Sequence, residues 1–149
     1  MAASKGVVVP PGGGKHLEES PGRIMSMKLF GHETGESVTL FEQTVPAGIK
    51  SWLHMHHDSD EVAWVLEGQF TFKIGKQVTT GGPGTCVFMP RNIPHAWKNS
   101  GSEPGRVVFL YTPAKAGRYV EAMLEHLDSD ERKKLLAECG WELLGPNPL

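Results

Sequence analysis

The sequence predicts an all-β sandwich or barrel, and three observations carry that prediction. The chain of 149 residues contains 18 glycines and 11 prolines, which interrupt it every few residues between Gly31 and Gly117. The pieces between these breaks are short and rich in Val, Phe, Trp and Thr, as strands are. No internal repeat and no long linker divides the chain, so we expect a single domain.

The expected elements follow in chain order. Residues 1–22 carry two Pro/Gly clusters and are expected to form an irregular N-terminal arm, with room for one edge strand. The barrel is expected over residues 23–113. Its predicted strands are 23–30, 37–45, 50–57, 61–66, 69–74, 77–80, 85–89, 95–98 and 106–112. The stretch 85–89 is apolar throughout, so we expect it to be buried on both faces, with Cys86 as a structural thiol.

After Pro113 the apolar residues recur at helical spacing. Asp128 to Glu131 has the pattern of a capping box, which predicts a second helix running to about Glu138. Gly140 stands where a helix-ending glycine belongs. Residues 114–149 are therefore predicted to be a C-terminal helical segment packed on the barrel. This segment would either cover one barrel end or make a dimer contact.

Composition argues against several classes of function. A formal net charge of −2 gives no reason to expect a nucleic-acid partner. No apolar run approaches the roughly 18 residues that a membrane span needs, and residues 1–11 lack the longer apolar core of a secretory signal. Cys86 and Cys139 are far apart in the sequence, and we expect both to be reduced thiols in a cytoplasmic protein.

The most informative segment is 48–61, which contains a His-x-His pair. In a strand, positions two apart share a face, so His54 and His56 can both point at one ion. Glu61 reaches the same ion if the chain turns after His56 and returns as a neighbouring strand. His95 arrives from elsewhere in the fold, as ligands in a barrel interior do. This set suits one divalent transition metal ion, and Fe, Mn, Ni, Co, Cu and Zn all stay open.

The remaining histidines are not expected to be ligands. His57 breaks the two-residue alternation, so we expect it to face outward or to lie behind the ligands. His16, His32 and His126 fall in the arm, a turn and a helix flank, and are expected at the surface.

A substrate pocket is expected beside the ion. Trp52 and Trp97 are each two residues from a ligand histidine, and Ala63 and Val65 share the face of Glu61. Phe41 or Gln43 would add to the wall from the preceding strand. Such a pocket is apolar and aromatic and suits a small, flat or aromatic molecule. The alternative is that these residues are packed core without a pocket.

Two residues are expected at the mouth of this pocket. Arg91 and Asn92 precede His95 in a loop rich in turn-forming residues. They would meet an anionic group of the substrate, or they are exposed loop residues.

The chain resembles the cupin family. The family's first motif, G-x5-H-x-H-x(3,4)-E-x6-G, is matched at every fixed position by Gly48, His54, His56, Glu61 and Gly68. The second motif, G-x5-P-x-G-x2-H-x3-N, is matched by Gly84, Pro90, His95 and Asn99, with Asn92 in place of a glycine. Asn is the residue that best tolerates the left-handed backbone that glycine supplies. Together the motifs cover residues 48–99.

The resemblance implies a double-stranded β-helix, or jelly roll, with the ion inside the barrel. It implies that His54, His56, Glu61 and His95 are the metal ligands and that one or two coordination positions stay open. The layout resembles small single-domain bacterial cupins grouped with quercetin dioxygenases. A metal-dependent, dioxygenase-type oxidoreductase acting on a small organic substrate is therefore the first hypothesis, with Glu61 as a catalytic base. Small cupins are often dimers, so the resemblance also favours a homodimer.

Two other hypotheses stay open at this point. The same ligands would serve a non-oxidative isomerase, decarboxylase or lyase. They would also serve a binding or sensing module that holds metal and a small molecule without turnover.

Overall fold

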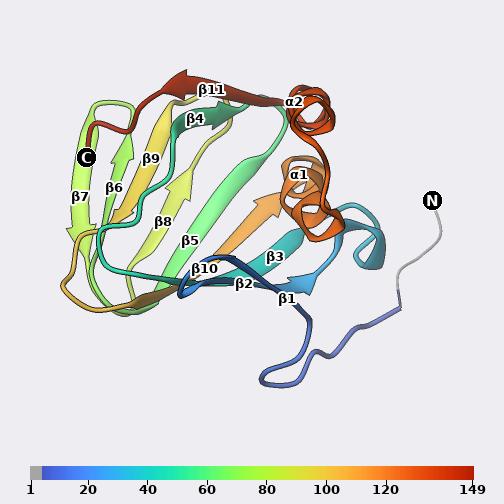
Figure 1. The fold of residues 1–149 in the computed structure, drawn as a ribbon, viewed down its shortest axis with the longest axis horizontal. Coiled ribbons are helices and arrows are strands. Elements are labelled where there is room, and N and C mark those ends of the chain that lie inside the picture. Colours follow the sequence, from blue (N-terminus) through green and yellow to red (C-terminus); the bar gives the residue numbers. More distant parts are fainter. Residues whose placement is uncertain (1–4) are drawn as a thin grey trace.

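The computed structural model describes residues 5–149; residues 1–4, the start of the predicted arm, lie outside the described part. Two antiparallel sheets face each other and enclose the interior of a barrel (Figure 1). The first sheet has the strand order β1-β2-β3-β10-β5-β8 and the second has the order β11-β4-β9-β6-β7. The predicted all-β class is confirmed.

The strands of the first sheet are β1 (Lys15–Ser20), β2 (Arg23–Leu29), β3 (Thr39–Val45), β10 (Gly105–Thr112), β5 (Asp60–Glu67) and β8 (Cys86–Met89). Those of the second are β11 (Trp141–Gly145), β4 (Leu53–His56), β9 (His95–Asn99), β6 (Phe70–Ile74) and β7 (Gln77–Gly81). All nine strands predicted from the sequence are present, most with ends shifted by one or two residues. Alternation explains this success, because every second residue of β3 and β10 is buried.

The core fills the space between the two sheets. Phe41 and Phe109 of the first sheet and Phe70 and Trp97 of the second are all at most 5% exposed. The rings of Trp97 and Phe109 meet across the barrel with centroids 5.5 Å apart. These aromatic rings form the centre of the core.

The two ends of the chain each add a strand. Part of the predicted irregular arm is the edge strand β1, which pairs with β2. In the predicted C-terminal helical segment, Trp141–Gly145 is not helical but forms β11, paired with β4. Gly140 has a φ of 77°, which ends the preceding helix and turns the chain into an extended course. The helical part of that prediction thus ends before Gly140.

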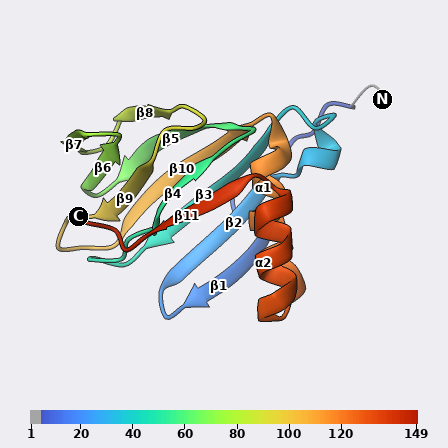
Figure 2. The ribbon, with the colours of Figure 1, turned by 90° about the horizontal axis from the view of Figure 1, so that it is seen from above.

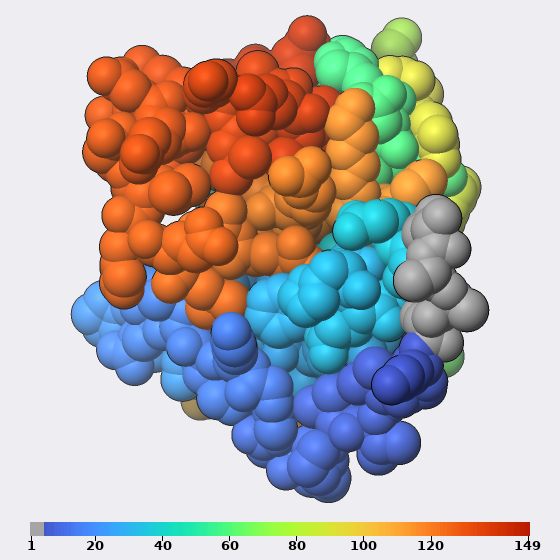
Figure 3. Space-filling view, turned by 90° about the vertical axis from the view of Figure 1, so that its right-hand side faces the viewer, coloured from blue at the N-terminus to red at the C-terminus, as the bar shows by residue number. Residues whose placement is uncertain are grey.

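The helices are short and lie on one side of the barrel, beside β11 and the N-terminal hairpin (Figure 2). They are α1 (Gly117–Ala122) and α2 (Ser129–Glu138), with 3-10 turns η1 (Gly31–Glu33), η2 (Ala114–Ala116) and η3 (Met123–Glu125). The predicted capping box is present, with Asp128 and Glu131 exchanging hydrogen bonds of 2.8 and 3.0 Å. Figure 3 shows these helices, orange to red, above the blue N-terminal residues.

No helix within residues 5–149 has both the length and the apolar character needed to cross a bilayer.

The prediction that residues 85–89 are buried on both faces is wrong. β8 is an edge strand of the first sheet, and one of its faces meets solvent. Cys86 is exposed and Phe88 is 56% exposed, whereas Met89 on the inner face is buried. The apolar run suggested burial on both faces because the outward positions of this strand are apolar as well. Cys86 is therefore not a buried structural thiol.

Candidate metal centre

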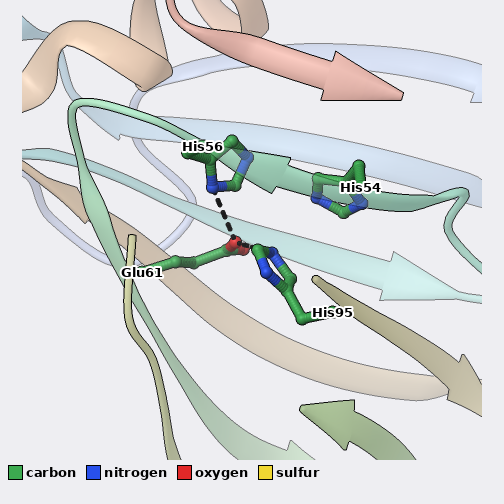
Figure 4. A group of neighbouring side chains, drawn as sticks. All are labelled: His54, His56, Glu61 and His95. Atoms are coloured by element: carbon green, nitrogen blue, oxygen red, sulfur yellow. Dashed lines mark hydrogen bonds and ion pairs between the residues drawn. The ribbon is translucent and has the colours of Figure 1, made fainter. Parts of the chain in front are cut away.

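The structure brings the four predicted ligand residues together inside the barrel (Figure 4). His54 and His56 lie on β4, Glu61 on β5 and His95 on β9. His54 faces His95 in the β4–β9 pair, and a turn at residues 57–59 leads the chain into β5, as expected. Each of the four is at most 4% exposed, and one potential ligand atom from each lies within 4.8 Å of the others.

Main-chain carbonyl groups fix the tautomers of two imidazoles. His54 Nδ1 lies 2.7 Å from the carbonyl oxygen of Trp52, and His95 Nδ1 lies 3.1 Å from that of Ile93. A carbonyl oxygen only accepts hydrogen bonds, so both Nδ1 atoms donate. This orientation leaves each Nε2 as the nitrogen available to an ion, in the way that outer hydrogen bonds prepare metal-binding histidines.

Glu61 lies between the imidazoles of His56 and His95. Its Oε2 is 3.0 Å from His95 Nε2 and 3.6 Å from His56 Nδ1. Burial lowers the pKa of His95, but the hydrogen bond and the charge of Glu61 outweigh burial, and the net pKa is raised. The hydrogen bond between His95 and Glu61 thus favours the protonated imidazole.

His54 and His56 behave in the opposite way. Burial, followed by the neighbouring charge of His95, lowers the pKa of His54 to about 3 and that of His56 to about 2. Both imidazoles are therefore neutral at pH 7, which is the form that binds metals.

The residues fit a divalent transition metal ion. His56 Nε2 is buried and has no hydrogen-bond partner within the described residues, an uncommon state for a buried nitrogen. Ligands about 2.0–2.2 Å from an ion lie up to about 4.3 Å apart, so the observed 4.8 Å closes with a small inward movement. The donor set of three imidazoles and one carboxylate suits several metals and does not select one of them.

The backbone around the cluster explains the fixed glycines of the two motifs. Gly48, Gly68 and Gly84 have φ values of 80°, 88° and 90°, in the region that glycine adopts without cost. Asn92, which replaces a motif glycine, has a φ of 64°. Its backbone N–H donates to the carbonyl oxygen of His56 at 2.8 Å. The sequence departure at this position therefore keeps the turn.

Two aromatic residues that sequence reasoning did not place at the site lie against the cluster. Trp141 of β11 stacks on His54 at 5.0 Å and meets His56 edge-on at 4.3 Å. Tyr111 of β10 lies edge-on to His56 at 5.0 Å and opposite Glu61 in the sheet. Burial, then the charge of Glu61, raises the pKa of Tyr111 well above its usual value, so its hydroxyl stays protonated. Period-2 alternation would have placed Tyr111 inside, but nothing local in the sequence showed that Trp141 belongs to a strand.

A cavity of about 280 Å³ adjoins the cluster. Of the predicted pocket residues, Trp52 and Trp97 line it, as do both Phe41 and Gln43. Ala63 and Val65 do not line it and are completely buried in the core. They share the inner face of β5 with Glu61 and pair with Phe109 and Val107, but neither side chain reaches the cavity. The prediction for these two residues is corrected accordingly.

The polar residues predicted at the mouth are engaged within the protein. Arg91 forms a hydrogen-bonded ion pair with Asp60 at 3.1 Å. His57 faces outward, 40% exposed, with its Nδ1 2.8 Å from Asn92 Oδ1. Arg91 and Asn92 therefore tie the loop before β9 to the turn between β4 and β5, and neither lines the cavity described above.

Comparison with known proteins agrees with this geometry. Residues 41–111 match the family model described as Cupin domain. This barrel is a cupin domain. Its jelly-roll fold, predicted from the two motifs, is thereby confirmed.

Similar proteins support the fold and leave the reaction open. An uncharacterized protein of Methanocaldococcus jannaschii is 30% identical over 79 residues, which span 53% of this chain and 63% of that protein. KdgF from Halomonas sp. superposes with a TM-score of 0.62 at 14% identity, covering 73% of this chain and 94% of that one. A protein from Thermotoga maritima, described as a predicted oxalate decarboxylase, superposes with a TM-score of 0.63 at 17% identity, covering 71% of this chain and 98% of that one.

Proposed function

We propose that this cupin is a metal-dependent enzyme, a dioxygenase-type oxidoreductase that acts on a small organic substrate with an aromatic or flat ring. One observation carries the proposal: His54 and Glu61 belong to the buried cluster and also line the adjoining cavity. A molecule in this cavity therefore lies directly against the ligand side chains. An ion held by His54, His56, Glu61 and His95 would supply Lewis-acid chemistry at an open coordination position.

The chain's own residues give this reaction its shape. Trp52 and Trp97 offer flat apolar walls that orient a ring. Glu61 lies at the cavity wall and accepts a hydrogen bond from His95, so it is placed to receive a proton from a bound substrate. The neighbouring Tyr111 keeps its proton because its pKa is raised, so Glu61 and not Tyr111 is available as the base.

The position of Glu61 also favours a second candidate. A reaction that only moves a proton, as in an isomerase, decarboxylase or lyase, needs a base at the cavity wall and no oxidant. A solved structure from Silicibacter pomeroyi, similar to this chain at 23% identity, is described as a sugar phosphate isomerase, and one from Acidithiobacillus ferrooxidans, at 24% identity, is described as a putative sugar phosphate isomerase. Oxygen consumption separates this candidate from the first one.

The test combines metal content with oxygen uptake. Protein purified without chelator is analysed for metals, and oxygen uptake is then followed on addition of quercetin and simple catechols. We expect about one ion per chain, and uptake that His54→Ala and His95→Ala both abolish. The matched control is His57→Ala, which removes the neighbouring exposed imidazole and should keep both metal and uptake.

Other results would support a different function or contradict the metal centre. Product formation without oxygen uptake would support the non-oxidative reaction, and a stoichiometric complex without product under air would support a binding module. Full metal content in His54→Ala and His95→Ala would contradict the metal centre itself.

The cytoplasmic location stays a prediction; both cysteines are free thiols, as it requires.

A further inference from the structure

The cavity has a second polar end, where charged side chains occupy inward-facing positions. On β2, Arg23 shares the inner face with Met25 and Met27, both completely buried, so its side chain enters the barrel. On β1, the ladder is irregular between Glu18 and Ser20. The residue between them, Glu19, lines the same cavity as Arg23. Polar side chains directed into a barrel interior are uncommon, and they mark this end as distinctive.

The guanidinium of Arg23 lies beside Glu19 without a hydrogen bond between them. Its Nε is 3.3 Å from Glu19 Oε2, yet this nitrogen is buried and has no hydrogen-bond partner within the described residues. Its Cζ lies 5.7 Å from the ring centre of Trp97. Among residues 5–149, no hydrogen bond to either Nη nitrogen is present. Arginine carries five donors in a planar fork, so the Nη edge is free to bind a ligand.

Gln43 adds an unsatisfied polar group beside this arginine. The residue is 5% exposed and lines the cavity. Its Nε2 donates to Glu19 Oε2 at 3.3 Å, which fixes the orientation of the amide. Its Oε1 is buried and has no partner in the described chain. Native proteins rarely leave such an atom unpaired. An amide oxygen only accepts hydrogen bonds, so it calls for a donor on the ligand, such as a hydroxyl, next to the group that Arg23 would bind.

Arg23 is the cation at this end that stays available to a ligand. Arg23, Lys50 and Glu19 all line the cavity, but Lys50 Nζ is engaged by the main-chain oxygens of Asn147 and Leu149. Burial raises the pKa of Glu19 against the opposing effect of Arg23, which weakens the attraction between Glu19 and the guanidinium. One available guanidinium suits a monoanion such as a carboxylate better than a phosphate dianion.

The space between the two ends is aromatic. In the first sheet, Tyr111 lies opposite Glu61, Phe109 opposite Phe41, and Val107 opposite Gln43. Gln43 is thus four residues along the strands from the level of Glu61, about 13 Å at the usual rise. Phe41, Trp97 and Phe109 line the cavity between these levels. The distance suits a molecule with one or two rings whose ends differ in polarity.

We propose that the Arg23 end of the cavity binds the carboxylate of an organic acid, whose ring lies against the aromatic residues and whose far end faces the metal cluster. That this acid is the substrate rests on the proposed function; the carboxylate site itself does not. Arg23 thereby becomes the residue that meets the anionic group of the substrate, a role that was one of two alternatives expected for Arg91 from the sequence.

The experiment compares matched acids and amides by calorimetric titration. Metal-free protein is used first, because a bound ion also attracts carboxylates, and zinc-loaded protein is then titrated in the same way. The probes are benzoate and 3-phenylpropionate, the corresponding amides, and phenyl phosphate. We expect each acid to bind about tenfold or more tightly than its amide, the difference that one charge-assisted, bidentate contact gives.

The variants assign that preference to one side chain. Arg23→Gln should remove it, and Arg23→Lys should keep part of it, since lysine retains the charge without the fork. Arg91→Gln makes the same charge change at the surface and should leave the preference intact. Circular dichroism of each variant shows whether it is folded, and Arg23→Lys keeps the proposal testable if Arg23→Gln is not.

Several results would overturn the proposal: acid and amide binding equally, a preference that survives in Arg23→Gln, no binding of any acid, or phenyl phosphate binding more tightly than benzoate. These results are separate from those for the enzyme. Acid preference in a protein without turnover would refute the proposed function alone. Turnover without acid preference would refute only the carboxylate site.

Discussion

Within the cluster, three residues of the same type differ in charge because their surroundings differ. His54 and His56 lose their protons to burial, whereas His95 keeps one because Glu61 lies 3.0 Å away. An ion held by these residues would therefore compete with a proton at His95 but not at His54 or His56.

This difference predicts the pH dependence of metal affinity. Below the raised pKa of His95 the metal-free site is protonated, so apparent Zn²⁺ affinity should rise about tenfold per pH unit and level off above that pKa. His54 and His56, with pKa values of about 3 and about 2, add no slope near neutrality. Competition titrations between about pH 5 and 8 measure the slope. A slope of two or three protons, as ordinary imidazoles near 6.5 would give, would contradict this assignment.

At the scale of elements, β11 supports the strand that carries two of the histidines. Leu143 pairs with His54 and Trp141 with His56. Trp141 also donates from Nε1 to the carbonyl oxygen of Ala116 at 2.9 Å, which ties the strand to the helical side. The four-residue strand β4 thus lies between β11 and β9 and is not an edge.

Removing this support should cost stability. Trp141→Ala deletes a partly buried indole and its hydrogen bond, and we expect the free energy of unfolding to fall by about 2–3 kcal/mol, below the loss for a fully buried tryptophan. Trp52→Ala is the matched control: that indole is 62% exposed, so its loss should change stability by no more than about 0.5 kcal/mol. Urea unfolding followed by circular dichroism compares the two, and equal losses would show that β11 does not brace β4.

Local sequence patterns predicted most strands and the ligand cluster, but not the features that depend on contacts between distant parts of the chain. The glycine and proline breaks, with short strand-like segments between them, located nine strands, and the spacing of His54, His56, Glu61 and His95 indicated the cluster that the fold assembles. The strand at Trp141 was missed because a short apolar segment after a helix has the same composition whether it docks or pairs. Ala63 and Val65 were misplaced because alternation gives the face of a residue but not its depth in the barrel.

At the scale of the whole molecule, the outer face of the first sheet carries an apolar patch. Trp64 lies opposite Cys86 and Val62 opposite Phe88; Trp64 is 48% and Phe88 56% exposed. Exposed apolar groups that adjoin one another are typical of protein contacts. We infer that this patch is where two copies of the chain meet, in agreement with the homodimer favoured by the family resemblance.

A charge at the centre of this patch should separate the copies. Light scattering after size exclusion should show a dimer for the wild type and a monomer for Trp64→Glu, since a self-complementary contact would bury the new carboxylate twice. Val78→Glu, at a position 55% exposed on β7 of the other sheet, should remain dimeric. A monomeric wild type, or a dimeric Trp64→Glu, would rule out this contact.

The pairing of β11 with β4 also bears on how the protein matures. The histidine pair is made early during synthesis, yet the strand that flanks it and the indole that holds its rings come from much later in the chain. Such distant partners are slow to find each other. A nascent chain emerging from the ribosome therefore exposes its imidazoles before β11 can hold them in register, and a complete metal centre would form only after this last strand has paired.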